Sequence, residues 1–182
     1  MTLTEITSLT LSRLNRNSGN TGKYEETFAL YANDAIRSIA EKYQAVRAET
    51  VTLSDASFNV SVLERDLFAI VRILDADGNE LDFYAPDDAS TGTIEVDTEE
   101  TSVKVVYRFV PTSVKNSQDE PEIPERYHGM IVYWVAGSEL TNGEAVSMSA
   151  ASANFQMFAR ELAKVRLSTF GAPSSRKLKN YT

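Results

Sequence analysis

The spacing of apolar residues changes twice along this chain, from a helical period to a strand period and back again. Between residues 22 and 43, apolar side chains such as Phe28, Ala32 and Ile36 recur three or four positions apart, which predicts an amphipathic helix. Over residues 49–110 the pattern is that of short β-strands, rich in β-branched and aromatic residues. The helical spacing then returns. This order of elements predicts an α+β protein.

Four helices are expected, over residues 4–16, 22–43, 124–141 and 144–168. Thr2 and Glu5 have the spacing of a capping box at the start of the first helix. Pro124 fits the first turn of the third helix, where its missing N–H costs no hydrogen bond. The apolar positions of the last helix include Val146, Ala150, Ala153, Met157, Leu162, Val165 and Leu167.

The third expected helix is apolar around most of its girth. It lies in EPEIPERYHGMIVYWVAGSEL (120–140), which holds the only Trp and the only His of the chain. A helix of this kind has to be buried by its neighbours. We expect the helix at 22–43 to cover one side and the last helix to cover the other, in an antiparallel bundle of about four helices.

Six short strands are expected, over residues 49–53, 57–64, 67–75, 79–85, 92–96 and 102–110. Asp77 and Gly78 predict a hairpin turn, because Gly tolerates a positive φ. The strands are predicted to form a small antiparallel β-sandwich or barrel inserted into the helical bundle. The expected domains are therefore a helical bundle (1–47 and 112–170), a β-module (48–111) and a mobile basic C-terminal arm (171–182).

The composition excludes several classes of protein. Cysteine is absent, which rules out disulfides, thiol chemistry and Cys-based metal sites. No apolar run reaches the roughly 18–20 residues that a membrane-spanning helix needs. The first residues, MTLTEITSLTLSRLNR, do not have the pattern of a secretory signal. We therefore expect a protein with no membrane partner, compatible with a reducing cytoplasm.

Charge is spread unevenly over the chain, whose net charge is −8. Residues 75–100 hold ten acids and no base, whereas residues 160–182 hold six bases and one acid. An acidic body is a poor general binder of nucleic acid, because duplex affinity comes mainly from neutralising phosphates. The short basic end is better suited to docking on an acidic partner.

Residues with catalytic potential are few. His128 is the only histidine, so a multi-His metal site or a Ser-His-Asp triad has almost no material, and a contact role is expected for it. The segment DADGNE (75–80) begins like a calcium loop but departs from that pattern afterwards, so a hairpin turn is favoured. Acid pairs such as Glu99 and Glu100 are read as a solvated surface. We expect no enzymatic activity, no cofactor and no metal site.

Five segments, in their order along the chain, point to one family. They are YANDAIRSIAEKY (31–43), the β-rich insert opening with ETVTL (49–53), VVYRFVPTSV (105–114), EPEIPERYHGMIVYWVAGSEL (120–140) and FQMFARELAKVR (155–166). This series resembles the head–tail connector (adaptor) proteins of tailed double-stranded DNA phages. Ala32 to Ile39 match that family's early A-x-x-x-I helix, and Pro124, Tyr127 and His128 match its entry to the third helix. The β-module is larger than the loop or hairpin that many adaptors have there.

The resemblance implies a structural virion protein of the neck, assembled in the cytoplasm of the host bacterium. Copies would form a ring of about twelve subunits that joins the portal protein to a tail, nozzle or stopper protein and lets duplex DNA pass without specific binding. The predicted portal-docking arm consists of Arg176, Lys177, Leu178, Lys179 and Tyr181. The predicted lumen-facing or tail-facing acidic surface consists of Asp75, Asp77, Glu80, Asp87, Asp88, Glu99 and Glu100.

Two other functions remain open from the residues alone. The β-module could bind a carbohydrate or a host surface, with strand aromatics such as Tyr84 or Tyr107 stacking on the ligand, while the helices attach it to a larger particle. An enzyme of the glycoside-hydrolase or nuclease kind is the third possibility, for which the sequence offers little support.

Overall fold

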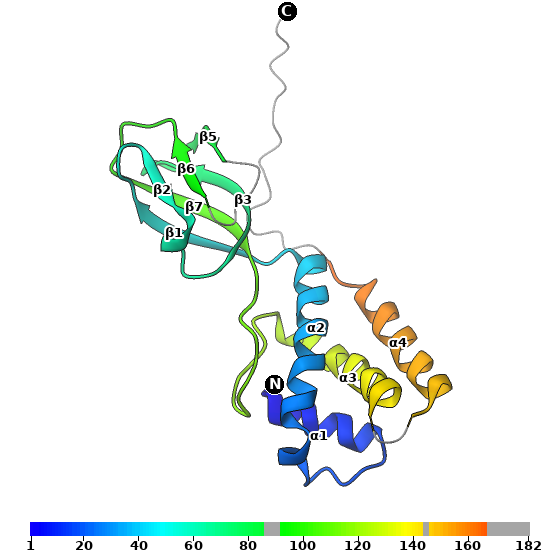
Figure 1. The fold of residues 1–182 in the computed structure, drawn as a ribbon. Coiled ribbons are helices and arrows are strands. Elements are labelled where there is room, and N and C mark those ends of the chain that lie inside the picture. The colour runs from blue at the N-terminus through cyan, green and yellow to red at the C-terminus, as the bar shows by residue number, and fades with distance from the viewer. Residues whose placement is uncertain (86–91, 144–145, 167–182) are drawn as a thin grey trace, which may run out of the picture. The chain divides into compact units, whose positions relative to one another are not determined.

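The computed structural model describes residues 1–85, 92–143 and 146–166 (Figure 1). Backbone contacts divide the chain into two compact units. Among the described residues, the helical unit contains Met1–Tyr43 and 111–166, and the β unit contains Gln44–Val110. Helices together with antiparallel sheets confirm the predicted α+β class.

The described part of the helical unit has four α-helices and two short 3-10 turns. These are α1 (Leu3–Arg13), η1 (Thr21–Lys23), α2 (Glu25–Tyr43), η3 (Glu125–Tyr127), α3 (His128–Asn142) and α4 (Met148–Leu162). The capping box predicted for the first helix is present, because the Glu5 N–H donates to Thr2 Oγ1 at 3.3 Å and the Thr2 N–H donates to Glu5 Oε2 at 2.9 Å. Helix α3 begins later than predicted, since the turn η3 precedes it.

Helix α3 is in contact with all three other helices of its unit. Its residues Ile131, Val135 and Ala136 have no exposed surface, as expected for a helix that is apolar around most of its girth. The sequence predicted two covering helices, and the structure adds α1 as a third. The inner side of α1 joins the same hydrophobic core through Leu3, Ile6 and Leu11.

The polar segment between the β unit and α3 is tied to the helices by hydrogen bonds. The backbone N–H groups of Leu3 and Thr4, which have no partner inside α1, donate to the carbonyl oxygens of Asp119 and Ser117 at 2.9 and 3.1 Å. Asn33 of α2 accepts from the Val114 N–H at 2.8 Å and donates to its carbonyl at 3.0 Å. This segment therefore completes the packing at the start of α1 and along α2.

Helix α4 is shorter than predicted. The predicted range was 144–168, whereas the helix runs from Met148 to Leu162. Its buried residues are Ala151, Asn154 and Phe158, and of the apolar positions named from the sequence Leu162 and Val165 pack with the helical core. Val146, also predicted to lie in this helix, precedes it and is 62% exposed.

Aromatic packing explains the orientation of α4. The ring of Trp134 on α3 lies 5.1 Å from that of Phe155 and 5.0 Å from that of Phe158, measured between centroids. Large rings bury more apolar area than alanine or serine does, so they decide which side of the helix faces inward.

The described part of the β unit contains two antiparallel sheets and one 3-10 turn. Its elements are β1 (Val46–Thr52), β2 (Ser57–Asn59), η2 (Val60–Val62), β3 (Leu67–Leu74), β4 (Glu80–Leu81), β5 (Phe83–Tyr84), β6 (Thr93–Val96) and β7 (Ser102–Phe109). The sheets have the orders β1-β7-β3-β4 and β2-β6-β5. The predicted strand at 57–64 is split because Asn59 Oδ1 accepts from the Ser61 N–H at 2.9 Å and starts the turn η2.

Both sheets contribute to one hydrophobic core. Alternate residues of β7, namely Val103, Val105 and Tyr107, pack with Phe58 and Ile94 of the three-stranded sheet. The two sheets are not joined into a closed ring of strands, so the barrel alternative is wrong. Because side chains alternate along a strand, each sheet also has an outer face that points away from this core.

We predict that Gly137→Ala destabilises the helical unit while Gly129→Ala on the same helix does not. A Cβ at Gly137 would lie 2.8 Å from the Phe155 ring, so α3 and α4 would have to separate or the ring would have to leave Trp134. At Gly129 nothing lies within 4 Å of such a Cβ. We expect a loss of about 1–2 kcal/mol for Gly137→Ala and a gain of about 0.5–1 kcal/mol for Gly129→Ala.

Urea unfolding followed by Trp fluorescence measures both free energies. Equal effects of the two substitutions would contradict the close approach of α3 and α4 at Gly137.

Candidate interaction surfaces

The predicted acidic surface starts at the turn between β3 and β4. Asp75 Oδ1 accepts from the Asn79 N–H at 2.7 Å, and Asp75 Oδ2 accepts from the Asn79 side-chain amide at 2.8 Å. The side-chain hydrogen bond from Asn79, with help from backbone N–H groups, lowers the pKa of Asp75. Gly78 has a φ of +88°, which confirms the predicted hairpin turn. Asp75 therefore holds this turn closed.

A second acidic turn lies against the first. The Ala76 N–H donates to Glu100 Oε2 at 3.3 Å, so the turn before β7 meets the β3–β4 turn. Three further acids in or beside these two turns are exposed, namely Asp77, Glu80 and Glu99. The structure thus brings Asp75 and Glu100 together at one end of the β unit. Asp87 and Asp88 lie outside the described residues.

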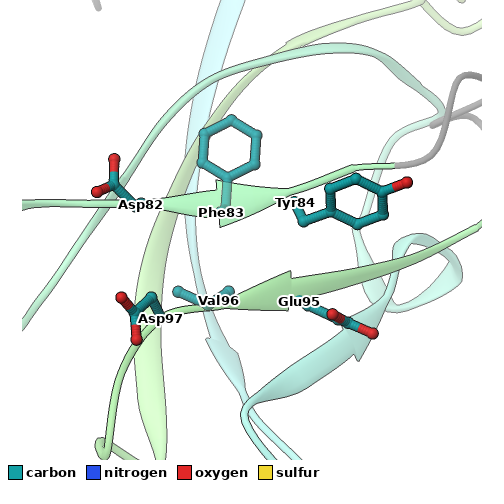
Figure 2. Close-up of a pocket in the computed structure, with 6 residues that line it drawn as sticks. All are labelled: Asp82, Phe83, Tyr84, Glu95, Val96 and Asp97. Carbon is teal, nitrogen blue, oxygen red and sulfur yellow. The ribbon is translucent and has the colours of Figure 1, made fainter.

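A separate acidic groove lies on β5 and β6 (Figure 2). Its volume is about 290 Å³, and its lining residues are Asp82, Phe83, Tyr84, Glu95, Val96 and Asp97. Tyr84 is opposite Glu95 in the strand register, and the Asp97 N–H donates to the Asp82 carbonyl at 2.9 Å. Like charges on neighbouring strands repel one another. A cationic or hydrogen-bonding partner bound in this groove would reduce the repulsion between its carboxylates.

The strand aromatics divide into core residues and one exposed residue. Tyr107 has no exposed surface, so it cannot stack on a ligand, and its suggested role in carbohydrate binding is wrong. Phe83 and Phe109 are partly buried against the β core. Tyr84 is 69% exposed beside the acidic groove and is the aromatic residue of this group that a ligand can reach.

Tyr107 belongs to a polar network at the edge of the β core. Its Oη donates to Glu49 Oε1 at 2.5 Å, and Arg47 Nε lies 2.8 Å from the same oxygen. The Glu64 N–H donates to Glu49 Oε2 at 3.0 Å, and Arg47 also pairs with the Glu64 carboxylate. These contacts fasten the segment that follows η2 to the strands β1 and β7. No local sequence pattern indicated this network.

Two groups of this network, the Glu49 carboxyl and the Tyr107 hydroxyl, have pKa values shifted from their ordinary ones. Burial alone would raise the pKa of Glu49, but the Tyr107 hydroxyl, the Glu64 N–H and the Arg47 guanidinium together lower it. Burial and the adjacent Glu49 carboxylate raise the pKa of Tyr107. The network is therefore intact over the neutral range, because Glu49 is charged and Tyr107 is neutral there.

His128 is buried and has a partner at each ring nitrogen. Nε2 lies 2.8 Å from the Ile123 carbonyl oxygen, and Nδ1 lies 3.0 Å from the amino group of Met1. A carbonyl oxygen only accepts, so Nε2 bears the proton and Nδ1 accepts from the ammonium group. A histidine engaged in this way holds η3 and the first turn of α3 in place.

Two arginines at and just after the end of α1, Arg13 and Arg16, make contacts that were not predicted from the sequence. Arg16 Nη1 lies 2.6 Å from Oε1 of Glu139, which is a buried acid on α3. Arg13 lies over the Tyr133 ring at 4.5 Å and donates to Asn154 Oδ1 of α4 at 2.5 Å. The sequence signal for these contacts was weak. It consisted of two polar residues, Glu139 and Asn154, among the apolar residues of α3 and α4.

The helical unit has an apolar groove of its own. It has a volume of about 400 Å³ and lies at the end of α3 and along α4. Its lining residues are Thr141, Met148, Ala151, Ser152, Phe155, Gln156 and Ala159. Residues 146–159 contain no charged side chain, and Met148 is 65% exposed.

Two other kinds of site are absent from the described ranges. No three His, Asp or Glu side chains there come close enough together to hold a metal ion. No helix in the same ranges has the length and apolar character to cross a membrane. The predicted portal-docking residues Arg176, Lys177, Leu178, Lys179 and Tyr181 lie outside the described residues.

The described residues therefore present charged and apolar contact surfaces on two small units, an arrangement suited to a protein that works by assembly. A family model described as SU10 adaptor protein matches residues 1–177, and the chain belongs to this SU10 adaptor protein family. No curated protein sequence matches the chain. The family confirms the resemblance to phage head–tail adaptors and indicates a structural role in a bacteriophage particle, in association with other head or tail components.

We predict that Tyr107→Phe destabilises the β unit by about 1–2 kcal/mol, because Glu49 would lose a donor in a partly buried site. The matched control is Tyr84→Phe, which removes the same atom from a side chain that is 69% exposed and should change stability by less than about 0.5 kcal/mol. Chemical denaturation measures both values. A Tyr107→Phe protein as stable as the control would contradict the role given to the network.

Proposed function

We propose that this chain is a head–tail connector subunit. Copies form a ring of about twelve subunits that joins the portal protein to the next protein on the tail side, which is a tail, nozzle or stopper protein. The observation that carries the proposal is the match of the SU10 adaptor family model over residues 1–177. The ring is assembled in the cytoplasm of the host bacterium and stays in the neck of the virion.

The charge of the β unit supports passage of duplex DNA without specific binding. Residues 44–110 contain fourteen acids and five bases. The acidic end of the unit, with Asp77, Glu80 and Glu99 exposed, would repel phosphates whether it faces the lumen or the tail. In this proposal the DNA slides past the ring because nothing in the lining holds it.

The helical unit is assigned to assembly. We propose that the helical domain (1–47 and 112–170) makes portal contacts and contacts between subunits, and that the inserted β-module (48–111) carries the lumen-facing or tail-facing acidic surface. The uncharged groove along α4 is suited to a helix or an apolar side chain of a neighbour. The basic C-terminal arm (171–182) would order on docking to the portal, as short charged segments commonly do.

The arm is tested by deleting residues 172–182. We expect a folded protein, because the core residues of both units lie at or before Val165, and loss of docking to purified portal rings in a pull-down. Substitution of Arg176, Lys177 and Lys179 by Ala should also weaken docking. Because this variant keeps the full length of the arm, it distinguishes the effect of the lost charges from the effect of the lost segment. Retained docking of the truncated chain would contradict the role of the arm.

The ring is tested by mass. Native mass measurements of the full chain alone, and of the chain mixed with portal rings, give the number of copies bound per portal. We expect about twelve copies per ring. A single copy per portal, or none, would overturn the proposal.

Carbohydrate or host-surface binding is the second candidate. The exposed Tyr84 ring beside Asp82, Glu95 and Asp97 favours it, because sugar sites often combine an aromatic face with carboxylates. Binding to a glycan array that disappears with Tyr84→Ala and persists with Phe68→Ala, another exposed aromatic residue of the β unit, would support this function. We expect no binding to the array.

A further inference from the structure

The outer face of the four-stranded sheet is basic. Val103, Val105 and Tyr107 of β7 enter the core, so the alternating residues Lys104 and Arg108 point to the outer side. Val106 lies between them on the strand and is only 2% exposed. Its register partner on β3 is Arg72, which like Arg108 is partly buried, whereas Lys104 is exposed. We call Arg72, Lys104 and Arg108 the basic face.

These three cations have no counterion within the described residues. The β unit has five bases, and the other two, Arg47 and Arg65, pair with Glu49 and Glu64. No ion pair in the described ranges includes a residue of the basic face, and Arg72 Nε is buried without a hydrogen-bond partner. Glu80, opposite Leu74 at the sheet edge, is the one acid on this side of the sheet and makes no ion pair there.

The basic face carries an electrostatic cost in the isolated chain. Lys104 and Arg108 are four residues apart on one strand, a separation of about 13 Å, and Arg72 lies beside the midpoint. Like charges on one face of a sheet repel each other, and a buried donor without an acceptor is unfavourable. A surface carrying carboxylates at matching positions would remove both costs.

The outer face of the three-stranded sheet has the opposite charge. Ile94 and Val96 of β6 enter the core, so Glu95 points outward together with its register partner Tyr84. Asp82 and Asp97 lie beside them, as Figure 2 shows. We call Asp82, Glu95 and Asp97 the acidic face. The strands of this sheet contain no base, and no ion pair in the described ranges involves these three carboxylates.

We propose that the basic face of one copy binds the acidic face of a second copy. Three cations meet three carboxylates, and the exposed Tyr84 ring offers an arginine a surface for cation–π contact. The two faces belong to opposite sheets of one sandwich, so a copy can bind one neighbour on each side. Such a contact is heterologous and closes into a ring if the rotation between copies allows it. The proposal rests on the ring of the proposed function and adds a contact between β units to the contacts assigned to the helical domain.

Duplex DNA is a poorer occupant of the basic face than a second copy is. Three cations neutralise few phosphates, and the β unit around them has nine more acids than bases. Carboxylates fixed on a folded sheet can approach at contact distance, where the pairing is local, whereas a duplex brings a long row of charges toward the acidic body.

The test is a pair of charge reversals. The first variant carries Lys104→Glu and Arg108→Glu, and the second carries Glu95→Lys and Asp97→Lys. Each alone places like charges across the contact, so we expect association between copies to fall at least tenfold. Mixed in equal amounts, the two variants should associate again, because each altered face meets a complementary one. Matched controls, Lys115→Glu and Asp66→Lys, change charge at exposed positions outside both faces and should behave as the wild type.

Analytical ultracentrifugation of the chain alone, and native mass measurement on portal rings, provide the readout, with circular dichroism as a check on folding. Restored association of the mixture supports the contact even if one variant is destabilised. If the wild type associates and both charge-reversal variants associate equally well, this contact is overturned but the ring is not. Wild-type copies that never associate, even on portal rings, overturn both. If the wild type binds duplex DNA and only the first variant loses this binding, the basic face is assigned to DNA instead.

Discussion

The enclosure of α3 determines how the rest of the chain is arranged. Two of its covering helices, α1 and α2, precede the β unit in sequence, and the third, α4, follows α3 itself. The chain must therefore leave the helical unit after α2 and return before α3. The β unit closes this excursion by pairing its first and last long strands, with Val46 opposite Arg108. An insertion with adjacent ends can vary in size without disturbing the core that surrounds α3.

Alternation along the strands then gives the β unit its two different outer faces. One side of β7 fills the core with Val103, Val105 and Tyr107, and the same pleat places Lys104 and Arg108 outside. On β6 the pattern runs Thr93, Ile94, Glu95, Val96, with the apolar residues inward. The two sheets thus share one core while differing in outer charge. A small sandwich of this kind can offer one neighbour a basic face and another neighbour an acidic one.

The sequence predicted what depends on local spacing. Helix α2, the capping box of Thr2 and Glu5 and the Asp77–Gly78 turn follow from residues that are close in sequence, and all are present. The sequence did not identify Ala151, Asn154 and Phe158 as the buried residues of α4, because Trp134, whose ring packs with Phe155 and Phe158, lies on another helix. The Glu49–Tyr107 contact joins residues 58 positions apart, and no local pattern marks it. The basic face was missed for the same reason, since register alone brings Arg72 beside the strand that holds Lys104 and Arg108.

The contrast between total charge and local charge bears on when such copies would meet. With a net charge of −8, two copies repel each other at a distance, and salt screens this repulsion beyond about 8 Å. The proposed contact acts only at short range, between three cations and three carboxylates. Weak contacts of this kind become effective when the copies are held close together, because tethering raises their effective concentration. An arm that docks each copy on a portal would supply that tethering, so that a chain remaining separate in dilute solution assembles where the ring is needed.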